Sequence, residues 1–161
     1  MNKFEFYHPI LTKFFSEWES ELQGCNYSVH LGFEVVNIKN KKYEPLDILV
    51  KMYPNDNMKH VILEEVQSDS IVRNIIIKIL NKDPEYGLPK HYSNSLIKKI
   101  NNYYKSKLQN HIRSFVTLNQ TKAYKCKNLP NFPHEDFWEF HYLLIDEIRN
   151  ISILIYGGAS S

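Results

Sequence analysis

The chain has 161 residues, of which 43% are hydrophobic and 14% aromatic, and its formal net charge at pH 7 is +2. This length predicts a single domain, residues 1–161, that can bury a core without disulfides or a structural metal. The sequence has no apolar run of about eighteen residues, which excludes a membrane-spanning helix, and no signal-peptide pattern. We therefore expect a cytoplasmic protein that does not bind membranes.

The small net charge hides a strong asymmetry along the chain. Residues 86–134 contain nine Lys or Arg and no Asp or Glu, whereas the rest of the chain has eleven Lys or Arg against eighteen Asp or Glu. A segment of one sign predicts a surface for a polyanion or an insert packed against an acidic body. We expect a basic helical insert at about residues 84–133, with nucleic acid as its partner.

The first half of the chain predicts one helix followed by three strands. Apolar residues at three- and four-residue spacing predict a helix over residues 7–23. Alternation of apolar and polar residues predicts a strand over 26–38, and two further short strands are predicted over 43–53 and 60–67. Because short polar turns separate these strands, we expect an antiparallel three-strand meander.

The second half predicts further helices and strands, and with the first half it defines a fold class. The predictions are helices over 71–80, 93–109 and 135–148, strands over 111–118 and 151–156, and a loop over 119–133. The continuous apolar run 151–156 is typical of a central strand. The whole order predicts an α+β fold, a mixed sheet containing the meander with helices packed against it.

The third predicted strand ends in a group of polar side chains: Glu64, Glu65, Gln67 and Asp69. Burial of an unpaired carboxylate is strongly unfavourable, so carboxylates on a buried strand indicate a site for a charged ligand. Asp47 falls on the neighbouring predicted strand. The alternative is that Glu64 and Glu65 pair with cations of the basic segment and that Asp69 caps a helix.

An Asp on one strand and Glu-x-Gln on the next resembles the active site of the PD-(D/E)xK nuclease superfamily, whose core also runs helix, three-strand meander, helix, strand. The resemblance implies that Asp47 and Glu65 bind Mg²⁺ or Mn²⁺ and that Gln67 replaces the lysine that positions the attacking water. The implied reaction is metal-dependent phosphodiester hydrolysis. The residues then expected to bind the substrate are Glu64, Asp69, Lys98, Lys99, Lys105 and Arg113.

Glu65-Val-Gln-Ser-Asp69 also resembles the Glu-Ile-Gln-Ser-Asp signature of a domain found in large polyvalent proteins of phages and mobile genetic elements. The resemblance extends loosely over residues 28–158 and implies a role in conflict between genomes, on nucleic acid. That signature usually continues Trp-His-Gln, whereas this chain has Ser70-Ile-Val72, so any role of that tryptophan is lost or moved.

Two other functions stay open on the sequence. The first is a non-catalytic inhibitor or immunity protein that binds a toxin or a defence protein through its acidic residues. The second is an acyltransferase, because the order of the later elements is similar to that of the GNAT family. The sequence lacks the Gly-x-Gly loop that would hold the cofactor pyrophosphate before a helix.

Overall fold

The computed structural model describes residues 3–38, 43–80 and 88–161. Its helices are α1 (Lys3–Leu22), α2 (Pro45–Met52), α3 (Ile71–Ile79), α4 (Asn94–Lys99) and α5 (Lys105–Phe115), and its strands are β1 (Ser28–Asn37), β2 (Ile62–Val66), β3 (Lys122–Lys127), β4 (Trp138–Asp146) and β5 (Ile151–Ser160). Two 3₁₀ turns, η1 (Ser68–Ser70) and η3 (Leu118–Gln120), precede α3 and β3, and a π turn, η2 (Ile100–Tyr104), joins α4 to α5.

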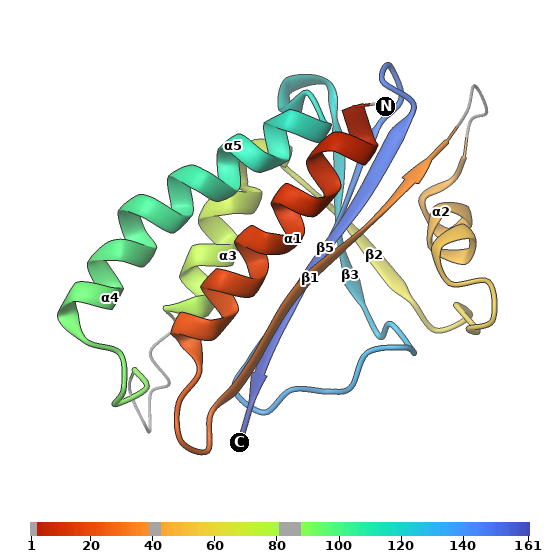
Figure 1. Ribbon diagram of the computed structural model, residues 1–161. Helices are drawn as coiled ribbons and strands as arrows, with labels where there is room; N and C mark the ends of the chain where they lie inside the picture. Colours follow the sequence, from red (N-terminus) through yellow and green to blue (C-terminus); the bar gives the residue numbers. More distant parts are fainter. Residues whose placement is uncertain (1–2, 39–42, 81–87) are drawn as a thin grey trace.

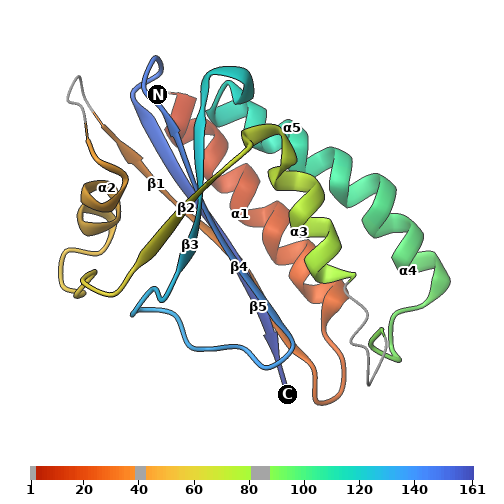
Figure 2. The same ribbon diagram turned by 180° about the vertical axis from the view of Figure 1, so that it is seen from behind.

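The five strands form one sheet with the order β1-β5-β4-β3-β2, and every neighbouring pair is antiparallel. Figure 1 shows α1, α3 and α4–α5 together on one face of the sheet and α2 alone on the other, and Figure 2 shows the same layers from behind. The predicted α+β class is confirmed. The predicted mixed sheet is wrong, because no described strand pair is parallel.

The sheet is buried on both faces at its centre. Along β5, Ile153 and Ile155 point into the core beneath α1, α3 and α5, whereas Leu154 belongs to a second core beneath α2. All three side chains are completely buried. Successive residues of a strand face opposite sides, so a strand that is covered on both sides has a continuous apolar sequence. The predicted central strand is confirmed, because β5 lies between β1 and β4.

Four other predicted elements are confirmed with small changes at their ends. The helix predicted over 7–23 is α1, the strand predicted over 26–38 is β1, the strand predicted over 60–67 is β2, and the helix predicted over 71–80 is α3. The two helices and β1 have an unambiguous apolar period in the sequence, which is the strongest local signal of structure.

The strand predicted over 43–53 is instead the helix α2, so the predicted meander of the first three strands is also wrong. Pro45 occupies the first turn of this helix, where its missing N–H leaves no donor unpaired. Ile48 and Leu49 are adjacent and both completely buried, which a strand covered on one face does not allow. The consecutive antiparallel strands of this fold are β2 to β5.

The helix predicted over 93–109 continues to Phe115, so the strand predicted over 111–118 is wrong. Ser93 caps its start, accepting a hydrogen bond from the Leu96 N–H at 3.0 Å. Its buried residues Ile100, Tyr104, Leu108 and Ile112 recur every four positions, more slowly than the α-helical period of about 3.6. The π turn η2 absorbs part of this drift and keeps the four side chains in the core.

The helix predicted over 135–148 is the strand β4, and the loop predicted over 119–133 contains β3. Phe140, Tyr142 and Leu144 lie in the core beneath the helices, and Leu143 and Ile145 lie in the core beneath α2. A strand that buries both faces has apolar residues at every spacing, including three and four, so it imitates a helical stripe.

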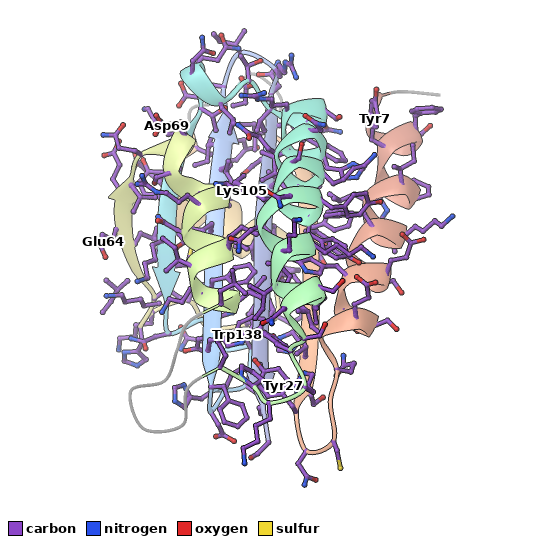
Figure 3. The ribbon with its side chains drawn as sticks, turned by 90° about the vertical axis from the view of Figure 1, so that its left-hand side faces the viewer. Tyr7, Tyr27, Glu64, Asp69, Lys105 and Trp138 are labelled. Atoms are coloured by element: carbon purple, nitrogen blue, oxygen red, sulfur yellow. The ribbon has the colours of Figure 1, made fainter. Side chains whose placement is uncertain are left out.

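A chain of aromatic hydroxyl and indole groups holds the start of α4 near the sheet. Trp138 Nε1 donates a hydrogen bond to the Tyr27 hydroxyl at 2.6 Å, and that hydroxyl lies 3.4 Å from the hydroxyl of Tyr92, just before α4. Figure 3 shows Tyr27 and Trp138 at this end of the molecule. All three residues are buried, so water does not compete for these contacts. They therefore fix the position at which α4 begins.

The assignment of α2 as a helix gives a test of stability. Ile48→Ala is expected to lower the free energy of unfolding by about 2–5 kcal/mol, because it leaves a cavity in a closed core. Val50→Ala is the matched control, because Val50 is 43% exposed, and it should change that free energy by about 0.5 kcal/mol or less. Urea unfolding measures both. A strand here would place Ile48 and Val50 on one face, so equal losses would contradict the helix.

Candidate functional site

The carboxylates that end the third predicted strand are not buried. Glu64, Glu65, Gln67 and Asp69 are all exposed, because β2 is an edge strand that pairs only with β3. Figure 3 shows Glu64 at this edge of the sheet. The prediction that these carboxylates lie on a buried strand is therefore wrong, and exposed carboxylates remain hydrated and require no special partner.

Each carboxylate of β2 interacts with a residue of the neighbouring strand. Glu64 lies 3.7 Å from Lys127 Nζ in an exposed ion pair. Glu65 stands opposite Tyr124 in the register, and burial together with the negative charge of Glu65 raises the pKa of that tyrosine. These contacts agree with the alternative of surface ion pairing for Glu64.

Asp47 is not on a strand next to β2. It is exposed in the first turn of α2, where a carboxylate interacts favourably with the helix dipole. The helix α2 packs against β1, at the opposite edge of the sheet from β2. Within residues 3–38, 43–80 and 88–161, no three His, Cys, Asp or Glu side chains form a group suited to a metal. Metal binding by Asp47 and Glu65, with Gln67, stays a prediction from the sequence.

The segment after β2 lines a hollow at the end of α5. Gln67, Ser68 and Asp69 form one wall of a cavity of about 620 Å³, and the end of α5, the turn η3 and the β4–β5 turn form the others. Its polar lining residues are Gln67, Ser68, Asp69, Gln109, Arg113, Thr117, Asn119 and Arg149. The structure thus brings together three predicted site residues, Gln67, Asp69 and Arg113, and Asp47 is not among the residues that line this cavity.

The completely buried carboxylate of Asp146 joins two walls of this cavity. Its Oδ2 accepts a hydrogen bond from the Thr117 N–H at 2.8 Å, and its Oδ1 accepts from the N–H groups of Ile148 and Arg149 at 3.1 and 3.0 Å. A buried carboxylate with several N–H donors is well compensated. Asp146 therefore fixes the β4–β5 turn, and with it Arg149, against the end of α5.

The wall formed by Gln67, Ser68 and Asp69 is also held by hydrogen bonds. Ser68 Oγ donates a hydrogen bond to the Leu118 carbonyl at 2.6 Å, and Thr121 Oγ1 donates to the Thr117 carbonyl at 2.6 Å. Ser68 therefore positions η1 against η3, fifty residues later in the chain. Among the described residues, the side chains of Gln67, Asp69 and Arg113 have no hydrogen bond or ion pair, so they are available to a ligand.

The predicted cationic residues lie on the outer surface of the helical layer. Figure 3 looks onto this layer, in which α3, α4–α5 and α1 lie side by side with Lys105 on the middle helix. Lys98 is exposed and forms no ion pair within the described chain. Lys99 differs, because its Nζ lies 2.6 Å from Glu21 Oε1 of α1 and 5.5 and 5.3 Å from the ring centroids of Tyr103 and Tyr104.

Glu21 marks where the basic surface meets α1. Burial would raise the pKa of Glu21, but hydrogen bonds from Lys99 and Tyr104 outweigh it and hold the pKa below its ordinary value. Burial and the same carboxylate raise the pKa of the Tyr104 hydroxyl, which stays protonated as the donor. Lys99 is therefore partly neutralised, unlike Lys98.

Sequence reasoning missed Gln109, Arg149 and Asp146. The helix predicted over 135–148 includes Asp146 and ends just before Arg149, although Asp146-Glu-Ile-Arg-Asn150 has the Asp and Asn at its ends that favour a turn. Asn150 has a φ of 55°, a left-handed conformation that Asn adopts more readily than most residues. A search for turn residues between apolar runs could have located this hairpin.

The sequence matches no protein-family profile and no curated protein. Two crystal structures of citrus MAF1 have a similar fold. In space group P 31 2 1 the TM-score is 0.63 at 10% identity, over 92% of this chain and 99% of that chain. In space group C 2 2 21 it is 0.62 at 12% identity, over 94% and 99%. At this identity the similarity establishes the fold alone, an antiparallel sheet with helices packed against it.

The comparisons leave the phage and mobile-element signature of Glu65–Asp69 as a prediction from the sequence. They likewise leave open the nuclease, inhibitor and acyltransferase functions. In the parts of the chain that the structure describes, no helix combines the length and apolar character needed to cross a lipid bilayer.

The role of Asp146 in building the cavity gives a second test of stability. Asp146→Asn places an amide donor where a carboxylate oxygen now accepts from N–H groups, so we expect it to lower the free energy of unfolding by about 1–3 kcal/mol. The control is Glu147→Gln, because Glu147 is 52% exposed and its ion pair to Lys122, at 3.8 Å, is on the surface. That control should lose less than about 1 kcal/mol in the same urea titration. Equal losses would show that Asp146 is not the cross-link.

Proposed function

We propose that this chain binds nucleic acid through phosphate contacts on the outer surface of α3 and α4–α5. The observation that carries the proposal is that these helices contain seven Lys or Arg residues and no Asp or Glu. We call this surface the basic face: Arg73, Lys78, Lys98, Lys99, Lys105, Lys107 and Arg113. Clustered cations without acids attract the phosphate backbone independently of base sequence.

The arrangement of the helices supports this proposal. The helices α3 and α5 pack against each other, so their cations belong to one helical layer. Lys78 lies at its β3 side, where it lines a hollow with residues of β3 and β4. Tyr103 is 47% exposed on this surface, with Lys107 Nζ 5.8 Å from the centroid of its ring. An exposed aromatic ring among cations is suited to stacking on an unpaired base.

Acidic residues limit the basic face on one side. The neighbouring helix α1 carries exposed Glu17 and Glu21, and Glu21 is the partner of Lys99. Because these carboxylates repel phosphate, a nucleic acid bound here would follow α4–α5 and α3 and avoid α1. Lys98, Lys107 and Arg73 then contribute more to binding than Lys99 does.

A pair of single substitutions tests the proposal. Lys98→Gln removes an exposed cation of the basic face, and Lys59→Gln removes an exposed cation from the segment between α2 and β2. We expect Lys98→Gln to weaken the binding of labelled single- and double-stranded oligonucleotides. It should also reduce the slope of log affinity against log salt concentration by about 1, because one fewer phosphate is neutralised. Fluorescence anisotropy over a salt series measures both quantities.

Lys59→Gln should leave the affinity and the slope unchanged. If the two variants lose affinity equally, the charge of the whole molecule and not the basic face governs binding. If the wild-type protein binds no oligonucleotide even at low salt, the proposed function is wrong.

A further inference from the structure

We propose that the cavity at the end of α5 binds a terminal phosphate-bearing nucleotide. This inference rests on the proposed nucleic-acid binding and specifies which part of the nucleic acid enters the cavity. The cavity adjoins the basic face, because Arg113 belongs to α5 and also lines the hollow. Figure 3 shows Asp69, at the start of the α3 segment, at the same end of the helical layer as the end of α5.

The cations of the cavity are suited to a phosphate monoester. Arg113 has no ion pair among the described residues, and Arg149 has only a 4.0 Å approach of its Nε to Asp146 Oδ2. Guanidinium groups bind phosphate oxygens through two parallel hydrogen bonds. A terminal phosphate has a charge of about −1.5 to −2 at neutral pH, by analogy with phosphoserine, and it gains more from two arginines than a singly charged diester does.

The other lining residues are suited to the rest of a nucleotide. The side-chain amides of Gln67, Gln109 and Asn119 can each donate and accept hydrogen bonds, as base edges require. The Asp69 carboxylate can accept from a sugar hydroxyl or a base amino group. With one carboxylate and two guanidinium groups, the lining complements a ligand that carries both an anion and hydrogen-bond donors.

The size and rigidity of the cavity agree with such a ligand. Its volume of about 620 Å³ lies within the range of about 300–1,000 Å³ found for small-molecule sites. Ser68 and Asp146 hold its walls through hydrogen bonds to Leu118 and Thr117. Ligand binding therefore costs less conformational entropy. A hollow of this size admits a chain end more easily than a continuous strand, which would have to enter and leave it.

The test compares one oligonucleotide with a 5′-hydroxyl, a 5′-phosphate or a 3′-phosphate. For the wild-type protein we expect one of the two terminal phosphates to raise the affinity about tenfold, the effect of a charge-assisted hydrogen bond. Arg113→Gln should remove this preference. Arg73→Gln, a basic-face arginine outside the cavity lining, should weaken binding of all three oligonucleotides and keep the preference. Arg73 and Arg113 are both exposed, and equal melting temperatures will verify that the variants fold.

The results separate this inference from the proposed function. Equal affinity for the three oligonucleotides overturns the terminal-nucleotide site and leaves binding by the basic face intact. Loss of the preference in Arg73→Gln as well overturns the site, because the preference would then arise from overall charge. Calorimetry with a nucleoside 5′-monophosphate tests the cavity without the basic face: binding that Arg113→Gln abolishes supports the site, even if no oligonucleotide binds.

Discussion

The rest of this structure depends on the burial of β4 and β5 on both faces of the sheet. Tyr142 and Ile155 require an apolar cover on one side, and Leu143 and Leu154 require one on the other. Because exposed apolar area of this extent is unfavourable, the chain must supply two layers. The helices α1, α3 and α5 form the larger layer, and α2 forms the smaller one. The outward position of the cations on α3 and α5 follows from this requirement.

The larger layer explains how residues distant in sequence form one basic surface. The inner sides of α3 and α5 are anchored by Ile75 and Ile112, which leaves Arg73 and Lys98 on the outer side of the layer. The same packing brings the end of α5 to the end of the sheet, where the buried Asp146 joins it to the β4–β5 turn. The basic face and the cavity are therefore two consequences of a single arrangement of helices on the sheet.

The sequence predicted the parts of this arrangement whose signals are local. The helix α1 and the strand β5 have clear periods, and the cations of residues 90–127 are visible in the composition. It could not separate a doubly buried strand from a helix over β4, because apolar residues then occur at every spacing. The sequence also does not show that β2 lies at an edge of the sheet, since edge position depends on pairing partners far away in the chain. For this reason Glu64 and Glu65 were expected to be buried. Because β4 was expected to be a helix, the sequence did not indicate that Arg149 and Asp69 line one cavity.

The proposed function places nucleic acid on the helical layer and not on the α2 side of the sheet. Acetylation of lysines with and without a bound oligonucleotide, followed by mass spectrometry, tests this most directly because each side chain reports its own exposure. We expect Lys98 and Lys107 to be protected, and Lys51 and Lys59, which are exposed in and after α2, to react equally in both samples. Protection of Lys51 and Lys59 with full reactivity of Lys98 and Lys107 would contradict it.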